Sequence, residues 1–253
     1  MRAAVLGSPI AHSLSPALHR AAYLALGLDW TYDAVECTSG ELAALLSGLG
    51  PEWAGLSLTM PLKQAVLPLL DTVTDLARDV AAANTVLVRD GVRHGDNTDV
   101  HGIVAALREA GVAAVGRAIV LGGGATARSA LAALRELGCD DIGLVVRSEP
   151  VETLAAGERL GLSPRVVGPE MITKADLVIS TLPVGAGDAL REHVVGVPAL
   201  LDVVYAPWPT ALATACGGVV VGGAAMLLHQ AARQVELMTG RPAPLEAMRA
   251  ALA

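Results

Sequence analysis

The stretch "RAIVLGGGATARSALAALRELG", residues 117–138, decides the fold. It begins with an apolar run typical of a buried strand, continues with a glycine cluster and ends with a helical pattern that stops at Gly138. Gly122, Gly124 and Ala127 occupy the positions of the pattern G-x-G-x-x-A. The first glycine would allow the tight turn, and the second would let backbone N–H groups approach a pyrophosphate. The stretch therefore predicts a dinucleotide-binding unit; a strand-to-helix turn without a ligand is the simpler alternative.

Short apolar runs alternate with helical patterns along the rest of the chain, which indicates an α/β protein with largely parallel sheet. We expect two α/β domains, an N-terminal substrate domain with a mostly parallel sheet and a Rossmann-like domain, with a cleft between them. Further strands are predicted at 3–7, 30–37, 54–59, 84–89, 142–147, 175–181, 199–205 and 217–223, and helices at 16–26 (capped by Ser15), 40–50 (capped by Ser39), 224–238 and 244–252, besides one that Asp99 caps and Gly111 ends.

The predicted domain division falls at Asp99. Residues 1–98 together with 224–253 are expected to form the substrate-binding and catalytic domain, and residues 99–223 the dinucleotide-binding domain. The two helices that close the chain are assigned to the first domain, because a chain can cross back after completing a second one.

The bulk composition excludes several classes of function. The 253 residues carry a net charge of -7, which argues against a nucleic-acid surface, where Lys and Arg would gather. No apolar run reaches the roughly 18 residues of a membrane span, and the opening residues lack a secretory signal pattern. Cys37, Cys139 and Cys216 are scattered without metal-like spacing, so we expect free thiols, no metal site and a cytoplasmic location.

The residues after the second strand of the dinucleotide-binding unit bear on the cofactor. A carboxylate there usually holds the ribose 2′-hydroxyl of NAD. The predicted strand 142–147 instead ends in Arg147, followed by Ser148, and a cation beside a hydroxyl suits the 2′-phosphate of NADP. Glu149 keeps NAD open as the weaker alternative, and a surface arginine without a ligand is the simplest interpretation.

A lysine and an aspartate are candidates for proton transfer. Lys63 follows Pro61 in the first turn of a predicted helix, where the helix dipole disfavours a cation by about 0.3–1 kcal/mol. It therefore points to solvent or has an anionic partner, and Asp99 is the candidate. If the two side chains meet, Lys63 can give a proton to a forming alkoxide. Two separate solvated charges remain the alternative from spacing alone.

Taken together, the motifs resemble those of the shikimate dehydrogenases along nearly the whole chain. The matching blocks are "GSPIAHSLSPALH" (7–19), "LTMPLK" (58–63), "ANT" (83–85), "DNTD" (96–99), "LGGGATAR" (121–128), "DVVYAPWPT" (202–210) and "MLLHQ" (226–230). The resemblance implies an enzyme of aromatic amino-acid biosynthesis that reversibly reduces 3-dehydroshikimate to shikimate with NADPH. Shikimate and 3-dehydroshikimate are then its small-molecule partners.

The resemblance also implies roles for individual residues. Lys63 and Asp99 would be the catalytic pair. The substrate would be held by Ser13, Ser15 and Tyr205 at its carboxylate and by Thr59, Asn84 and Gln230 at its hydroxyls. The cofactor would contact Gly122, Gly123, Gly124, Ala125, Thr126, Arg147, Ser148, Thr181, Val203 and Gly223.

The sequence departs from the family pattern near the cofactor. Ala125 follows Gly124 where a further glycine is usual, and Val151 replaces a basic residue that often supports the 2′-phosphate. A quinate/shikimate or aminoshikimate dehydrogenase that uses NAD therefore remains an alternative, as does a non-catalytic NADP-binding module. The helix at 244–252 and the edge of the first sheet are a candidate homodimer surface.

Overall fold

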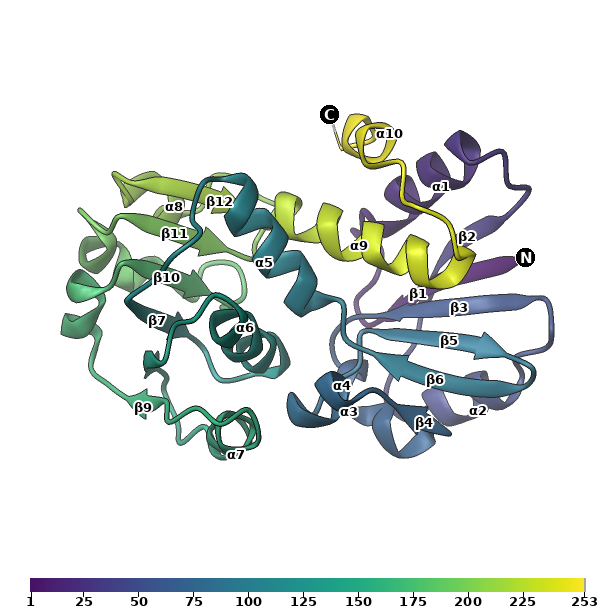
Figure 1. The fold of residues 1–253 in the computed structure, drawn as a ribbon, viewed down its shortest axis with the longest axis horizontal. Coiled ribbons are helices and arrows are strands. Elements are labelled where there is room, and N and C mark those ends of the chain that lie inside the picture. Colours follow the sequence, from purple (N-terminus) through teal and green to yellow (C-terminus); the bar gives the residue numbers. More distant parts are fainter. Residues whose placement is uncertain (253) are drawn as a thin grey trace. The chain divides into compact units, whose positions relative to one another are not determined.

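The computed structural model describes residues 1–252 and has an α/β architecture with two six-stranded sheets. The chain divides into two compact units, and each unit has its own sheet and helices (Figure 1). Unit 1 comprises Met1–Asp99 and the segment from Leu227 onward, and unit 2 comprises Val100–Met226. Among residues 1–252, no helix has the length and apolar character that crossing a membrane requires.

Unit 1 contains a mixed sheet with the strand order β2-β1-β3-β5-β6-β4. β2 and β3 pair in parallel with β1, and β4 pairs in parallel with β6, whereas β5 is antiparallel to both β3 and β6. Its elements are β1 (Arg2–Gly7), α1 (Ser15–Ala25), β2 (Thr31–Glu36), α2 (Leu42–Ser47), β3 (Trp53–Leu58), α3 (Leu62–Ala65), η1 (Leu67–Leu69), β4 (Thr72–Val73), α4 (Asp75–Asp79), β5 (Thr85–Arg89), β6 (Val92–Asp96) and α10 (Leu245–Ala250).

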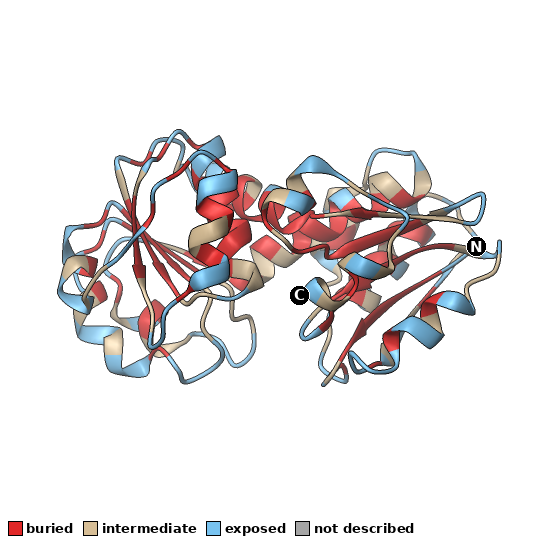
Figure 2. Cartoon of the chain, turned by 90° about the horizontal axis from the view of Figure 1, so that it is seen from below, coloured by how far each residue is buried: buried red, intermediate tan, exposed pale blue. Residues whose placement is uncertain are grey.

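Helices pack on both faces of this sheet, because side chains alternate between the faces along each strand. Ala3 and Val5 of β1 face a core shared with α1, α10 and α9 (Gly223–Thr239), a helix that begins in unit 2. Ala4 and Leu6 face the opposite core, which is shared with α2, α3 and α4. Figure 2 shows strands of both sheets as buried and most connecting loops as exposed.

Unit 2 has a fully parallel sheet with the order β12-β11-β10-β7-β8-β9. Counted from β7, this is the order 3-2-1-4-5-6 of the Rossmann fold. Its elements are α5 (Asp99–Glu109), β7 (Arg117–Leu121), α6 (Ala125–Glu136), β8 (Asp141–Val145), α7 (Val151–Arg159), β9 (Arg165–Val166), η2 (Pro169–Lys174), β10 (Leu177–Ser180), η3 (Asp188–Val194), β11 (Ala199–Asp202), α8 (Ala211–Ala215) and β12 (Val219–Gly222), with α5 starting on the last residue of unit 1.

Several predicted helix starts are corrected by the structure. Ser15 is the first helical residue of α1 and makes no capping hydrogen bond. Ser39 does not cap α2, which begins at Leu42 without a side-chain cap. Asp99 is the first residue of α5, and its amide donates to the Asn97 side-chain oxygen (3.1 Å). In these loops a hydroxyl or amide side chain forms a hydrogen bond within its own turn. Such local bonds of Ser and Asn side chains commonly compete with helix capping.

Strand β6 was not predicted and makes the first sheet mixed. Asp90 and Gly91 both have positive φ (52° and 77°), the backbone that two-residue β-hairpins prefer. The chain therefore reverses there and "VRHGD" returns alongside β5. β8 also ends at Val145 and not at Arg147 as predicted, so Arg147 lies in the loop that follows.

Candidate active site

The Lys63 and Asp99 side chains meet within unit 1. Lys63 Nζ lies 2.6 Å from Asp99 Oδ2, and the two side chains are only 15% and 5% exposed. The backbone holds both ends of this pair. The Lys63 carbonyl accepts a hydrogen bond from the Ala83 amide (2.8 Å), and Asp99 starts α5. The anionic partner expected for a lysine at a helix start is therefore present.

Asn84 donates a hydrogen bond to the other carboxylate oxygen of Asp99. Its Nδ2 donates to Asp99 Oδ1 (2.8 Å) and to Thr98 Oγ1 (3.0 Å), and its Oδ1 accepts from the Thr98 amide (2.8 Å). Gln230 Oε1 lies 3.3 Å from the same Nδ2. Both oxygens of the buried carboxylate are thus satisfied by this chain, which fixes its orientation.

Lys63 retains hydrogen-bonding capacity that Asp99 does not use. An ammonium group has three N–H donors. Within residues 1–252, Asp99 is the only recorded hydrogen-bonding partner of Lys63 Nζ. The remaining N–H groups are therefore available to a ligand oxygen, beside the Asn84 and Gln230 amides.

The serine loop, defined here as residues 13–15, leads into α1, whose first residue is Ser15. Ser13 is half-buried, and its Oγ accepts from the Ser15 amide (3.3 Å). Ser15 is buried and its side chain interacts with the Tyr32 hydroxyl, where it acts to lower the pKa of a phenol that burial raises. The two serines are thus ordered by the fold of unit 1 before any ligand binds.

Thr59 follows the carboxyl end of β3, and its amide donates to the Leu6 carbonyl (2.9 Å). A Cβ at Gly7 would come within 2.3 Å of Thr59 Cγ2. A glycine at this position is therefore what allows Thr59 to lie against β1.

Sequence reasoning missed a buried polar cluster next to these residues. Gln234, Ser57, Tyr32 and His19 are each at most 4% exposed and are joined by hydrogen bonds. Burial lowers the pKa of His19 from 6.5 to about 3, against an opposing contribution from Gln234, so the imidazole is neutral. A signal was available, because Gln234 lies four residues after Gln230 on the same helix and therefore on the same face.

The glycine turn of unit 2 has the backbone that dinucleotide binding needs. Gly122 has a φ of 106°, which only glycine adopts readily, and a Cβ there would lie 2.5 Å from Thr181 Oγ1. Gly124 precedes α6, and a Cβ on it would meet nothing within 4 Å. The first turn of this twelve-residue helix, with Ala125 and Thr126, therefore presents open backbone amides.

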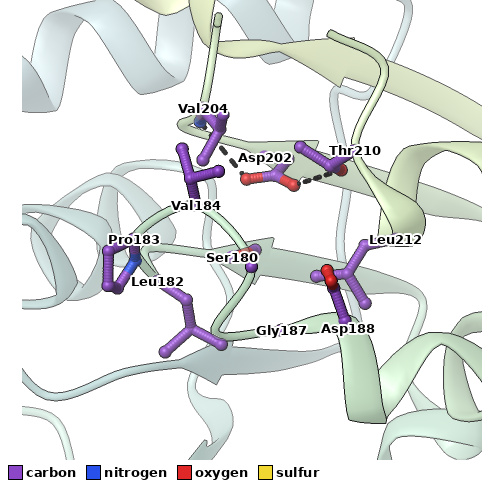
Figure 3. A pocket seen from close by; sticks show the side chains of 11 residues that line it. Ser180, Leu182, Pro183, Val184, Gly187, Asp188, Asp202, Val204, Thr210 and Leu212 are labelled. Carbon is purple, nitrogen blue, oxygen red and sulfur yellow. Dashed lines mark hydrogen bonds between the residues drawn. The ribbon is translucent and has the colours of Figure 1, made fainter. Parts of the chain in front are cut away.

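A pocket lies at the carboxyl ends of β10 and β11, the edge where α/β folds bind ligands (Figure 3). Burial raises the pKa of Asp202 in its wall, and Thr210 Oγ1 donates to the carboxylate (2.7 Å). Val203 follows β11, and a Cβ on Gly223 would lie 2.1 Å from the Val203 carbonyl. Gly223 is thus required for the close approach of these two segments.

The remaining predicted residues also belong to unit 2. Arg147 and Ser148 are exposed, and within residues 1–252 no hydrogen bond or ion pair of their side chains is recorded. Glu149 beside them is exposed as well. Tyr205 follows β11 and is partly buried, which raises the pKa of its hydroxyl. Tyr205 belongs to unit 2, whereas Lys63 belongs to unit 1.

Comparisons with known proteins agree with these features. A family model described as the shikimate dehydrogenase substrate binding domain matches residues 5–86, and one described as the shikimate 5'-dehydrogenase C-terminal domain matches residues 223–253. A Synechocystis protein named shikimate dehydrogenase (NADP(+)) is 37% identical over 98% of this chain and 93% of its own length. The chain belongs to the shikimate dehydrogenase family.

Solved structures of the shikimate dehydrogenase family share the fold. The Mycobacterium tuberculosis shikimate dehydrogenase is 45% identical with a TM-score of 0.92, and the match covers 99% of this chain and 98% of that one. The Thermus thermophilus enzyme, solved in complex with NADP(H) and shikimate, is 37% identical with a TM-score of 0.90 over 99% and 98%. A Corynebacterium glutamicum quinate dehydrogenase in complex with NAD is 27% identical with a TM-score of 0.88 over 100% and 98%.

Proposed function

We propose that this protein is an NADP-dependent shikimate dehydrogenase that interconverts 3-dehydroshikimate and shikimate on the route to aromatic amino acids. The observation that carries the proposal is the buried Lys63–Asp99 pair with donor capacity left on the lysine. Membership in the family and the Rossmann order of unit 2 support it.

Lys63 is the proton donor when the ketone is reduced. When bound, NADPH supplies a hydride to the carbonyl carbon. Lys63 Nζ then donates a proton to the oxygen that becomes the hydroxyl, and it takes that proton back in the oxidation direction. Asp99 orients the ammonium, and the positive charge of Lys63 stabilises the oxyanion as it forms.

The substrate is recognised by neutral hydrogen-bonding groups. Ser13 and Ser15, with Tyr205 assisting, hold the carboxylate, and Thr59, Asn84 and Gln230 surround the ring hydroxyls. A wrong ligand leaves such groups unpaired, and each unpaired group weakens the binding free energy by about 1–3 kcal/mol. Selectivity for one polyhydroxylated acid follows from that penalty.

The residues of unit 2 fit a nicotinamide dinucleotide. The amides of Gly122, Gly123, Gly124, Ala125 and Thr126 would hold the pyrophosphate, because Gly122 has a φ that favours glycine and the helix start at Gly124 is open. Arg147 and Ser148 are exposed and take the 2′-phosphate. Thr181, Val203 and Gly223 would contact the cofactor as well.

Residues 1–98 with 224–253 are proposed as the substrate domain and residues 99–223 as the dinucleotide domain. A cytoplasmic location is supported by three free, buried cysteines, which suit a reducing compartment.

A homodimer through the edge strand β2 is a further proposal, and light scattering tests it.

Steady-state oxidation of shikimate with NADP tests the function. We expect turnover by the wild type and a kcat about 10²–10⁴-fold lower for Lys63→Ala, with a modest loss of shikimate affinity. Lys174→Ala is the matched control, because Lys174 is an exposed lysine of unit 2. A purified wild type that oxidises shikimate with neither nicotinamide cofactor would contradict the proposal.

A quinate/shikimate or aminoshikimate dehydrogenase that uses NAD is the second candidate, and the exposed Glu149 beside Arg147 favours it. Kinetics on shikimate and quinate, each with NADP and with NAD, separate the two. The same assay tests the alternative of a non-catalytic NADP-binding module. Binding alone requires no proton donor, so such a module would show no turnover either as the wild type or as Lys63→Ala.

A further inference from the structure

Gln234 is the central residue of the buried polar cluster in unit 1. It lies on α9 and is 1% exposed. Its Nε2 donates to the Asn84 carbonyl (3.2 Å) and Thr85 Oγ1 (3.0 Å). Its Oε1 accepts from Ser57 Oγ (2.7 Å) and lies 3.2 Å from His19 Nε2. An amide has two N–H groups and two lone pairs, so these four neighbours saturate it.

One side of Gln234 leads to the reacting pair. Thr85 Oγ1 accepts a hydrogen bond from Gln234 Nε2 and donates one to Asn84 Oδ1 (2.8 Å). Asn84 Nδ2 then donates to Asp99 Oδ1 (2.8 Å). Gln234 therefore reaches the partner of Lys63 through a continuous series of short hydrogen bonds, and it also holds the Asn84 backbone.

The other side of Gln234 leads to the serine loop. Ser57 Oγ, which donates to Gln234, accepts from the Tyr32 hydroxyl (2.6 Å). Tyr32 lies on β2, which packs against α1, the helix that begins at Ser15. His19, the fourth neighbour of Gln234, lies one turn further along α1 than Ser15 and stacks on Tyr32, with ring centroids 4.0 Å apart.

We propose that Gln234 is a positioning residue that holds the serine loop in register with the Lys63–Asp99 pair. The proposal rests on the function proposed above, in which the loop binds the carboxylate of shikimate and the pair acts on its ring oxygen. A rigid substrate that is held at both ends reacts well only if the two ends of the site keep their spacing. A misplacement of about 1 Å can cost 100-fold in rate.

Gln234→Met tests the proposal, because methionine has a similar length and no amide group. We expect kcat to fall about tenfold and the KM for shikimate to rise about tenfold, while the KM for NADP changes less than twofold. Met248→Ala is the matched control, because Met248 is fully buried in the apolar core that α9 shares with α1 but has no part in the polar cluster. It should lower the melting temperature without changing either KM.

Two further variants separate the ends of the cluster and remain informative if Gln234→Met does not fold. Tyr32→Phe removes only the hydrogen bond to Ser57, on the side of the cluster that faces α1, so we expect a higher KM for shikimate with kcat within twofold of wild type. Thr85→Val removes the link to the Asn84 side chain and leaves the bond from Gln234 to the Asn84 carbonyl, so we expect a lower kcat with a smaller change in KM.

Unchanged kcat and KM in Gln234→Met, or equal effects of Tyr32→Phe and Thr85→Val on both constants, would overturn the proposal. So would a loss in Gln234→Met that Met248→Ala reproduces at a matched melting temperature. Wild-type turnover is measured first. If the wild type fails to oxidise shikimate, the proposed function is refuted, whereas an active wild type with insensitive variants refutes the positioning role alone.

Discussion

Replacing His19 by glutamine is expected to reduce the acid sensitivity of folding, because the wild-type imidazole is buried without a charged partner. Its neighbours are the Tyr23 and Tyr32 phenols and the Gln234 amide, all uncharged in this range. Burial lowers the pKa of His19 from 6.5 to about 3. Between these values the unfolded chain binds a proton that the folded chain excludes, so the free energy of unfolding falls as the pH falls.

The size of this effect follows from the two pKa values. Proton linkage with 6.5 unfolded and about 3 folded gives a loss of about 2.5 kcal/mol between pH 7.5 and pH 4.5. Glutamine has an amide that can still face Gln234 and does not titrate. The wild type should therefore lose about 2.5 kcal/mol more than His19→Gln over this interval, whatever the other titrating groups contribute.

Urea unfolding at the two pH values measures this difference. The measurement is best made in a Trp208→Phe background, because the remaining tryptophans, Trp30 and Trp53, both lie in unit 1 with His19. His12→Gln is the matched control, since His12 is exposed and belongs to the same unit. Equal losses of unfolding free energy in the wild type and in His19→Gln would show that His19 is not held neutral by burial.

Three other substitutions have defined outcomes. Arg147→Ala should raise the KM for NADP far more than that for NAD, because the exposed guanidinium is proposed to bind only the 2′-phosphate; equal changes would contradict this. Gly223→Ala should destabilise unit 2 by about 1–3 kcal/mol in thermal unfolding, because the added Cβ would lie 2.1 Å from the Val203 carbonyl. Thr210→Val should lower the free energy of unfolding by about 1–3 kcal/mol, because it removes both a donor to the buried Asp202 carboxylate and the side-chain cap of α8; unchanged stability would mean that water replaces the hydroxyl.

Long, strongly periodic elements were predictable because their signals are local. The glycine turn and the helix after it, here α6, follow from the residues alone, and so does α9, predicted at 224–238 and observed at Gly223–Thr239. The short elements β4, α4, β6, α7 and β9 were not predicted. β4, α4 and β9 have two, five and two residues, too few to show a period, and β6 forms only because the turn at Asp90 and Gly91 places it beside β5; α7 is as amphipathic as α5 and was simply missed.

The candidate site was only partly predictable. The motifs singled out Lys63, Asp99 and Asn84, but spacing along the chain leaves open which side chains touch. The hydrogen bonds of Gln234 and His19, which are 215 residues apart, depend on α9 packing against the first sheet. Both residues look like ordinary helix positions when considered alone.

The sequence by itself determined the α/β class, the dinucleotide-type turn at Gly122 and the family, because these depend on periodicity, glycine positions and motifs within short stretches. Only the tertiary structure decided that Asp99 accepts from both Lys63 and Asn84, and that a buried polar cluster connects Asn84 through Gln234 with Tyr32 and with His19 of α1. The physical reason is that burial and hydrogen-bond geometry arise from segments distant in the chain, and a buried polar group is stable only where such segments supply its partners.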